Sequence, residues 1–402
     1  MITLYKHQQD IVDLFPKKQG IFWGLGTGKT YAALALAQKT GEKTLIICPK
    51  MLREKWQRDA EEWKVDCLVV TKEEFRRDFK TLPACGTVII DECHQTFASL
   101  KSKGHKALML YLKVRTPEYV YPLTGTPYTS TPFSIFALAR ILGHKWDWVD
   151  FRRKYFVERY MGNRVIFEPR TGIENEIAEL ARQIGTVVRL DECIDVPQQT
   201  FAEESFEMTV EQKKEMKHMQ ATESNPLTRF GLAHQIAQGI LIGDEYTATK
   251  TFPALKNQRV VALAQENEKM VVFSRYNAHL RLLSDMLDKE GILNTIINGD
   301  TKDRDGMIRA ADSSKRIVLL VQDQCGTGWE APSFSIMIHA SHGYSFVEYL
   351  QAMGRILRIN APKPNYYLSL STKGSADLPV RKAMKEKEDF HEAIFIRENL
   401  EI

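Results

Sequence analysis

A glycine-rich run lies between an apolar segment and a helix-forming segment near the start of the chain. Residues 21–23 are apolar, residues 24–30 read Gly-Leu-Gly-Thr-Gly-Lys-Thr, and residues 31–37 are dominated by Ala and Leu. In the order strand, turn and helix, such a run lets consecutive backbone N–H groups surround a phosphate, and the helix N-terminus attracts the anion. The sequence therefore predicts a triphosphate-binding loop at the edge of an α/β sheet.

Two polar residues of this loop have distinct expected roles. Lys29 would reach the β- and γ-phosphates, and Thr30 would bind Mg²⁺ through its hydroxyl group. The strict motif has glycine where this chain has Trp23, so Gly24 and Gly26 would supply the flexibility instead. A glycine-rich turn with an incidental lysine is the alternative, and the flanking strand and helix patterns disfavour it.

Two adjacent carboxylates, Asp91 and Glu92, follow the apolar residues 88–90. Ligands gather at the carboxyl ends of strands in open parallel sheets, and a buried unpaired carboxylate is costly. Beside a phosphate loop, we expect Asp91 to meet Mg²⁺, directly or through water, and Glu92 to orient and deprotonate the attacking water. The alternative is a solvated turn at a strand end. With the phosphate loop present, the pair predicts an ATPase.

Short apolar runs alternate with helical patterns in both halves of the 402-residue chain, which predicts two α/β domains of similar build. From about residue 142 to 255 the strand rhythm fades and helical patterns replace it. We expect a first domain over residues 1–200 and a second over 201–402, with a hinge near Pro197 to Glu204. Residues 378–402 predict a surface helix.

Composition excludes several classes of protein. The 55 basic and 51 acidic residues leave a formal charge of +4, which neither requires nor excludes a polyanionic partner. The six cysteines are scattered without a Cys-x-x-Cys pair, which disfavours a disulfide scaffold or a zinc ribbon. No secretory leader is recognisable, and the apolar runs fall short of the roughly 20 residues of a membrane helix. We expect a soluble protein of a reducing compartment without a membrane partner.

Beyond these two elements, the sequence resembles the superfamily 2 helicases and translocases. The phosphate loop precedes the box Asp91-Glu92-Cys93-His94, residues 123–127 resemble the coupling motif Leu-Thr-Gly-Thr-Pro, and residues 351–358 resemble the block Gln-x-x-Gly-Arg-x-x-Arg. Among the branches, the SWI/SNF-type (DEAD/DEAH-box-like) double-stranded DNA translocases are the most similar. The supporting segments are residues 4–8, residues 47–52 followed by Trp56, residues 102–103 and 106–108, and residues 272–276. The chain has no recognisable remodeller insertions, which suggests a compact bacterial or bacteriophage member.

The resemblance implies ATP and Mg²⁺ as cofactors, bound between two RecA-like parallel-sheet domains in tandem, with helical insertions around the hinge. Gln8 would hydrogen-bond the adenine, and Arg355 and Arg358 of the second domain would be arginine fingers on the γ-phosphate. The expected catalytic residues are Lys29, Asp91, Glu92, Arg355 and Arg358. The expected nucleotide-binding residues are Gln8, Gly26, Thr27, Gly28, Lys29, Thr30 and Gln351, with Thr30 and Asp91 at the metal. The expected coupling residues are Thr124, Thr126 and Gly328.

The resemblance also implies nucleic acid held mainly through its phosphates, with little sequence preference. The expected contacts are Lys50, Trp56, Lys103, Arg275 and Thr327. Three residues depart from the usual motifs, namely Cys93 in the acidic box and Trp329 and Glu330 after the glycine-rich motif of the second domain. Residues 144–170 interleave basic and aromatic side chains. They predict either a stacking platform for unpaired bases or, as the favoured alternative, an amphipathic helix whose aromatics belong to the core and whose basic side chains are solvated.

The function expected from these features is that of an ATP-dependent DNA translocase or helicase acting on double-stranded or branched DNA. It would work in the cytoplasm of a bacterium or of a phage-infected cell, with replication, repair or recombination proteins as possible partners. The alternatives are an RNA helicase, a nucleotide-gated DNA clamp without productive turnover, and a nuclease motor, for which no separate nuclease segment is recognisable. No segment identifies a strand-separating wedge, so unwinding and translocation both stay open.

Overall fold

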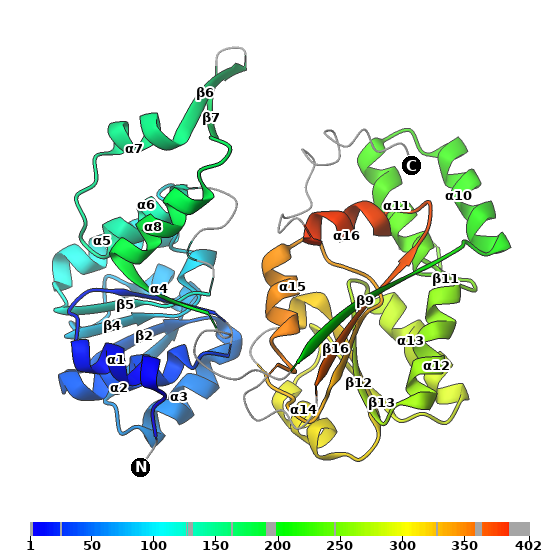
Figure 1. Ribbon diagram of the computed structural model, residues 1–402, viewed down its shortest axis with the longest axis horizontal. Coiled ribbons are helices and arrows are strands. Elements are labelled where there is room, and N and C mark those ends of the chain that lie inside the picture. Colours follow the sequence, from blue (N-terminus) through cyan, green and yellow to red (C-terminus); the bar gives the residue numbers. More distant parts are fainter. Residues whose placement is uncertain are drawn as a thin grey trace. The chain divides into compact units, whose positions relative to one another are not determined.

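The computed structural model describes most of the chain, and its internal contacts divide it into two compact units, Met1–Asp195 (unit 1) and Val196–Ile402 (unit 2) (Figure 1). The described residues are 3–24, 26–125, 127, 132–161, 164–189, 198–244, 247–326, 329–357 and 364–385.

Unit 1 is built around a parallel sheet. Its elements are α1 (Lys6–Leu14), β1 (Gly20–Trp23), α2 (Lys29–Thr40), β2 (Thr44–Cys48), the 3-10 turn η1 (Lys50–Leu52), α3 (Arg53–Glu62), β3 (Cys67–Thr71), α4 (Lys72–Asp78), β4 (Thr87–Ile90), η2 (Cys93–Gln95), α5 (Lys103–Arg115), β5 (Tyr119–Pro122), α6 (Phe133–Ile141), α7 (Trp148–Tyr155), β6 (Phe156–Met161), β7 (Arg164–Pro169), α8 (Glu174–Ile184) and β8 (Gly185–Val188).

The strands β3, β2, β4 and β5 pair in that order, all parallel, and β1 pairs with β8, also in parallel. Single bridges, among them Ile21 with Leu123, join β1 to β5. Alternate residues of one strand enter opposite cores: Ile46 packs with α2 and α3, and Ile47 packs with α5 and α6. Helices cover both faces of this sheet, as Figure 1 shows. The sequences of its strands are therefore mostly continuous apolar runs.

The antiparallel pair β6–β7 departs from the helical pattern expected between the domains. Figure 1 shows it extending from α7, away from the sheet of unit 1. At its base, Phe156 is buried in the core of unit 1, while Tyr160 near its end is 75% exposed. The hairpin is therefore anchored at one end only.

Unit 2 contains a second parallel sheet. Its elements are β9 (Gln199–Phe206), α10 (Val210–Thr222), α11 (Pro226–Ala237), β10 (Ile240–Leu241), β11 (Lys250–Thr251), α12 (Leu255–Glu266), β12 (Lys269–Ser274), α13 (Asn277–Lys289), β13 (Asn294–Ile297), α14 (Arg304–Ser313), β14 (Ile317–Gln322), η3 (Asp323–Cys325), β15 (Ile336–His339), α15 (Phe346–Met353), β16 (Asn365–Thr372) and α16 (Asp377–Lys385).

Six strands of unit 2 pair in parallel in the order β13, β14, β12, β15, β16 and β9. Val272 of β12 packs with α12 and α13 on one face, and its neighbour Phe273 packs with α14 and α15 on the other. The expected α/β fold with a parallel sheet in each of two units is thus confirmed, and its RecA-like character stays a prediction. Most of the segment expected as a hinge is strand β9, because pairing with β16 satisfies its backbone groups.

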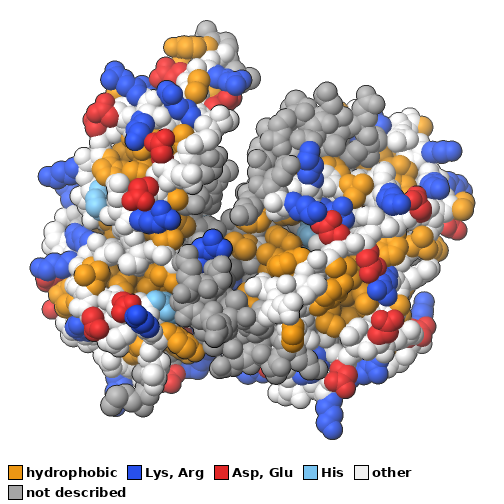
Figure 2. Space-filling view, in the orientation of Figure 1, with side chains coloured by type: hydrophobic (Ala, Val, Ile, Leu, Met, Phe, Trp, Pro, Cys, Tyr) orange, Lys and Arg blue, Asp and Glu red, His pale blue; other side chains and the backbone are white. Residues whose placement is uncertain are grey.

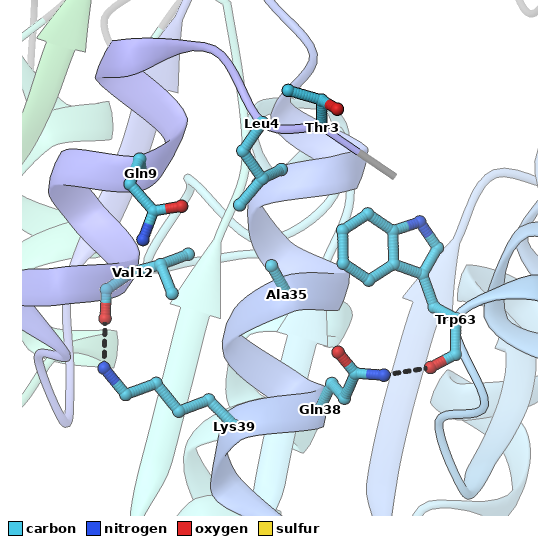
Figure 3. Close-up of a pocket in the computed structure, with 8 residues that line it drawn as sticks. All are labelled: Thr3, Leu4, Gln9, Val12, Ala35, Gln38, Lys39 and Trp63. Atoms are coloured by element: carbon cyan, nitrogen blue, oxygen red, sulfur yellow. Dashed lines mark hydrogen bonds between the residues drawn. The ribbon is translucent and has the colours of Figure 1, made fainter. Parts of the chain in front are cut away.

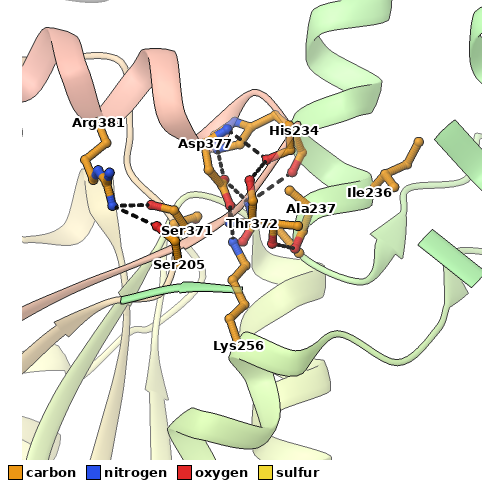
Figure 4. A network of polar contacts seen from close by, with 12 residues as sticks. Ser205, His234, Ile236, Ala237, Lys256, Ser371, Thr372, Asp377 and Arg381 are labelled. Carbon is orange, nitrogen blue, oxygen red and sulfur yellow. Dashed lines mark hydrogen bonds and ion pairs between the residues drawn. The ribbon is translucent and has the colours of Figure 1, made fainter. Parts of the chain in front are cut away.

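A buried ionic network attaches α16 to the rest of unit 2 (Figure 4). The Lys256 ammonium lies 2.6 Å from Asp377, and both side chains are almost fully enclosed. Gln238 donates to the same carboxylate at 2.8 Å. Burial alone would raise the pKa of Asp377, but the Lys256 charge and the hydrogen bonds hold it well below its usual range. Of the surface helix expected over 378–402, the residues after Lys385 lie outside the described residues.

In the part of the chain that the structure describes, no helix has both the length and the apolar character needed to span a membrane. On the face drawn in Figure 2, Lys and Arg side chains alternate with acidic ones over both units. Charges of both signs are thus mixed on this face, in keeping with the near-neutral composition of the chain.

Candidate nucleotide site

The glycine-rich loop between β1 and α2 adopts a backbone that requires glycine. Gly26 and Gly28 both have φ near +78°, in the left-handed region that side chains disfavour. A Cβ atom on Gly28 would also lie 2.1 Å from Nε2 of Gln8, closer than atoms can approach. Two independent constraints thus explain glycine at position 28.

Gln8 of α1 is bound to this loop. Its side chain is 1% exposed, and its amide nitrogen lies 3.2 Å from the carbonyl oxygens of both Thr27 and Gly28. Its amide oxygen accepts a hydrogen bond from the backbone of Tyr5, which closes the first turn of α1. The ring of His7 adds a contact of 2.8 Å to the Thr27 carbonyl. Gln8 therefore braces the loop, and its contact with adenine stays a prediction.

Lys29 begins α2 and directs its ammonium group back into the loop. Nζ donates to the carbonyl oxygens of Trp23 at 2.8 Å and Gly24 at 3.1 Å. A Cβ built on Gly125 would lie 3.8 Å from the same Nζ, so the segment after β5 borders the lysine. Neutral carbonyls are weaker acceptors than phosphate oxygens. The ammonium is consequently placed where a phosphate could replace these partners.

Asp91 follows β4 directly and is 6% exposed. One carboxylate oxygen accepts from the indole nitrogen of Trp56 at 2.8 Å, and the other from the backbone of Glu92 at 2.9 Å. Burial raises the pKa of Asp91, and the Glu92 charge adds to this, while Trp56, Lys72 and Lys29 oppose it. Burial thus disfavours the ionised carboxylate of Asp91, and a bound cation would favour it.

Asp91 and Thr30, the residues expected at the metal, carry oxygen atoms that suit Mg²⁺ as ligands. A carboxylate offers about four acceptor positions, of which the two hydrogen bonds to Asp91 occupy two. Thr30, in the first turn of α2, adds a half-buried hydroxyl group. Carboxylate and hydroxyl oxygens are hard ligands of the kind that Mg²⁺ prefers.

Glu92 has a strained backbone. Its φ of 45° and ψ of 50° are left-handed, an uncommon conformation for a residue with a side chain, which costs about 1–3 kcal/mol. Nζ of Lys72 holds its carbonyl oxygen at 2.7 Å, and the next N–H, that of Cys93, donates to Leu123 at 3.0 Å. These bonds turn the chain sharply at the end of β4 and set the direction of the Glu92 side chain.

Lys72 is a candidate functional residue that the sequence reasoning missed. It is 4% exposed, and it also donates to the side-chain oxygen of Gln95 at 2.9 Å. Burial lowers the pKa of Lys72, whereas the charges of Asp91 and Glu92 raise it. The available signal was a lysine directly after the β-strand pattern of residues 67–71, at the same edge of the sheet as the acidic box.

His94 connects the acidic box to the expected coupling motif. Its Nδ1 lies 2.9 Å from the hydroxyl oxygen of Thr124 and 3.3 Å from a carboxylate oxygen of Glu92. Burial lowers the pKa of His94 to about 4, so the ring is neutral near pH 7 and the contact with Glu92 is not an ion pair. Thr124 is fully buried and donates its N–H to Ile21 of β1. Thr126 lies outside the described residues.

The predicted nucleic-acid residues of unit 1 differ in accessibility. Lys50 begins η1 and Lys103 begins α5, and both are exposed. Trp56 is only 2% exposed and bonded to Asp91. An enclosed indole offers no surface to a strand, so the position of Trp56 disagrees with the contact expected from the sequence. The apolar face of α3 carries the indole into the core.

In unit 2, Arg355 is 8% exposed and donates to the backbone oxygens of Gln351 and Trp329, each at 2.8 Å. Its role as an arginine finger stays a prediction, as does nucleotide binding by Gln351, which is 6% exposed. Trp329 fills the core beside Phe273, which accounts for this departure from the usual motif. Arg358, Thr327 and Gly328 lie outside the described residues.

Arg275 directly follows β12, and its guanidinium lies 3.8 Å from the centre of the Tyr344 ring. Its backbone N–H donates to the Ser341 hydroxyl at 2.9 Å. The stacked ring restrains the guanidinium at the end of the sheet. Contact between Arg275 and a nucleic-acid backbone stays a prediction.

The aromatic residues of segment 144–170 mostly belong to the core. Phe151, Tyr155 and Phe156 are buried, and the Arg152 guanidinium lies 4.7 Å from the centre of the Phe167 ring. The core alternative expected from the sequence is therefore confirmed for these residues. Tyr160, which is largely exposed, is the exception.

A pocket of about 490 Å³ lies between α1, α2 and Trp63 (Figure 3). Lys39 and Gln38 of α2 point toward it, and each donates a hydrogen bond across its border, to the Val12 and Trp63 carbonyls. None of the predicted nucleotide-binding residues lines this pocket. It is therefore separate from the loop described above.

Comparison with known proteins finds a similarity to helicases within unit 2. Residues 254–360 match the family described as "Helicase conserved C-terminal domain". Among solved structures, the chain is similar to the "Sulfolobus solfataricus SWI2/SNF2 ATPase core in complex with dsDNA", with 17% identity and a TM-score of 0.42 over 96% of this chain and 91% of that chain. A likeness at that level assigns no residue role. No curated protein matches the chain. The similarity that these comparisons show is therefore that of residues 254–360 in unit 2 to the conserved C-terminal domain of helicases.

Proposed function

We propose that this protein is a superfamily 2 ATPase, a DNA translocase or helicase of the SWI/SNF type that couples ATP hydrolysis to movement along, or remodelling of, double-stranded or branched DNA. The observation that carries the proposal is the convergence of the loop lysine, the acidic box and Thr124 at one edge of the unit 1 sheet. A structural turn would not require a buried carboxylate, a strained glutamate and a neutral histidine in mutual contact.

Each residue of this group has a defined task in the proposed reaction. Lys29 binds the β- and γ-phosphates, and Asp91 with Thr30 holds Mg²⁺, which neutralises phosphate charge when bound. Glu92 accepts the proton of the attacking water and directs that water at the γ-phosphorus atom. His94, neutral near pH 7, places one ring nitrogen, Nδ1, against both the Thr124 hydroxyl and the Glu92 carboxylate, so the state of the carboxylate can alter the contact with Thr124. Arg355 and Arg358 are proposed to stabilise the charge that develops on the γ-phosphate.

Exposed lysines of unit 1 support the nucleic-acid part of the proposal. Lys50 and Lys103 project from turns at the starts of η1 and α5. Exposed lysines of this kind contact the phosphates of nucleic acids, and such contacts do not depend on the base sequence. A bacterial or phage-infected cytoplasm, and partners in replication, repair or recombination, are the setting we propose for such a motor.

Steady-state ATP hydrolysis tests the proposed function. The protein is assayed alone and with single-stranded DNA, double-stranded DNA, a four-way junction and RNA, at two salt concentrations. We expect stimulation by duplex or junction DNA that weakens at the higher salt, because phosphate contacts release counterions. Stimulation by RNA alone would indicate an RNA helicase. Tight DNA binding without hydrolysis would indicate a nucleotide-gated clamp.

A further inference from the structure

The indole of Trp56 makes a polar contact that its packing does not require. It is 2% exposed, and its Nε1 donates to Oδ2 of Asp91 at 2.8 Å, between side chains 35 residues apart in the chain. A hydrogen bond from a neutral donor to a buried carboxylate is stronger than one between neutral groups. The bond also selects one orientation of the carboxylate, because the other oxygen accepts from the backbone of Glu92.

A second tryptophan of the same region provides a contrast. Trp63 caps the C-terminal end of α3, is 7% exposed, and packs near the ring of Tyr31. Its indole nitrogen has no hydrogen-bond partner among the described residues. Trp63 shows that an indole can be buried beside α3 without a hydrogen bond from its nitrogen. The bond from Trp56 to Asp91 is therefore not a requirement of burial.

Trp56 also lies close in the chain to the exposed turn that carries Lys50. Residues 49–52 leave the end of β2, and α3 begins at Arg53, so Trp56 is in the first turn of that helix. The backbone N–H of Asp91 donates to Ile47 of β2 at 2.8 Å. Asp91 is therefore bonded at two points to one continuous segment. Its backbone is bonded to β2, and its side chain is bonded to Trp56, which follows β2 and the turn in the chain. The turn and the Asp91 carboxylate are thus connected through Trp56 as well as through β2.

We propose that Trp56 is a positioning residue that orients Asp91 for Mg²⁺ and links that carboxylate to the turn of residues 49–52. The inference rests on the proposed function, because it assigns Asp91 to magnesium and Lys50 to DNA. It replaces the direct nucleic-acid contact expected for Trp56 with an indirect effect of DNA on the metal site.

Magnesium dependence of nucleotide binding tests the first part of the inference without turnover. Binding of a fluorescent, non-hydrolysable ATP analogue to the full chain is titrated with Mg²⁺ in the wild type, Trp56→Phe and Trp63→Phe. Both variants lose the same atoms, but only the first loses a hydrogen bond to a charged group. We expect the half-saturating Mg²⁺ concentration to increase about tenfold in Trp56→Phe and by less than about twofold in Trp63→Phe. Equal values in the two variants would overturn the positioning role.

Repeating the titration with duplex DNA tests the link to the turn. In the wild type, DNA should lower the half-saturating Mg²⁺ concentration by about fivefold, within the usual range of coupling between two sites. Trp63→Phe should keep this shift, and Trp56→Phe should lose most of it. A full shift in Trp56→Phe, or no shift in the wild type, would overturn the link.

Two further results separate the possible failures. Absence of any Mg²⁺-dependent nucleotide binding in the wild type would reject the proposed function, whereas normal wild-type binding with an unaffected Trp56→Phe rejects the inference alone. If Trp56→Phe does not fold, the ¹⁵N-indole spectrum of the wild type replaces it, with Trp56 assigned by Phe substitution of the other five tryptophans. Its resonance must shift when Mg²⁺ joins the bound nucleotide, and an unshifted resonance overturns the inference.

Discussion

The imidazole of His94 lies 2.9 Å from the hydroxyl oxygen of Thr124, so the acidic box and the coupling motif are in direct contact within unit 1. Thr124 is fully buried and bonded through its backbone to Ile21, two residues before the end of β1. The acidic box, the coupling motif and β1, the strand that precedes the phosphate loop, are thereby joined by hydrogen bonds although they lie far apart in the sequence. A change of charge at Glu92 can reach the phosphate loop and β5 through His94 and Thr124.

Thr124→Val tests this contact. The variant keeps the shape of the side chain but removes the hydroxyl group that lies 2.9 Å from the buried ring nitrogen Nδ1 of His94, which leaves that nitrogen only its longer contact with Glu92. We expect ATP binding close to that of the wild type and DNA-stimulated turnover lower by about tenfold, since an unsatisfied buried group costs about 1–3 kcal/mol. Steady-state kinetics measure both. Thr81→Val, at an exposed threonine, is the control, and equal turnover in the two variants would contradict the coupling role.

Glu92→Gln tests the proposed general base. The glutamine retains the size of the side chain but cannot accept the proton of the attacking water. We expect hydrolysis to decrease by about 10²–10⁴-fold while nucleotide binding persists, which traps the ATP-bound state. Single-turnover hydrolysis and nucleotide-retention assays separate the two effects. Hydrolysis at the wild-type rate would reassign the base.

Lys29→Ala tests the phosphate contact. Nζ now donates to the Trp23 and Gly24 carbonyls, and the variant removes the cation intended for the β- and γ-phosphates. We expect ATP affinity to decrease by at least about tenfold, as loss of a charge-assisted hydrogen bond implies. Equilibrium binding of a fluorescent ATP analogue provides the measurement. Lys101→Ala, at an exposed lysine elsewhere in unit 1, should bind normally.

Lys72→Met tests the support of the strained Glu92 backbone. Methionine fills similar space, but the Glu92 carbonyl and the Gln95 side chain lose their buried donor. We expect the free energy of unfolding to decrease by about 1–3 kcal/mol and turnover to decrease with little change in ATP affinity. Denaturant unfolding and steady-state kinetics provide the two readouts. Unchanged turnover in a destabilised variant would make Lys72 purely structural.

His279→Gln tests how a buried histidine affects stability against pH. Burial lowers the pKa of His279 to about 3, and its ring lies between Ser274 and Asn257. The unfolded chain therefore binds the proton more readily, so the free energy of unfolding contributed by His279 decreases as pH falls below about 6.5, by about 1.4 kcal/mol for each pH unit well below that value.

Denaturant unfolding at pH 7 and pH 5 provides the measurement for His279. We expect the wild type to lose more stability between these values than His279→Gln does. His218→Gln, at an exposed histidine, should behave as the wild type. An identical loss in wild type and His279→Gln would show that the buried ring does not titrate as expected.

Local patterns were enough to predict the fold class and the position of the nucleotide loop. Each of the strands β2, β4, β12 and β14 contains a run of consecutive apolar residues, because both faces of a parallel sheet are buried. The loop glycines were recognisable because their left-handed backbone excludes other residues. The hairpin β6–β7 was missed, since its aromatic and basic residues follow no clean alternation along the chain.

The sequence by itself determined which residues are catalytic candidates, because short motifs encode backbone geometry and ligand chemistry over a few positions. Only the tertiary structure decided what surrounds them. Trp56 reaches Asp91 across 35 residues and Lys72 reaches Glu92 across 20, contacts that depend on the order of strands β3, β2 and β4 in the sheet. Strand order is a property of packing between distant segments, and no pattern within one segment contains it.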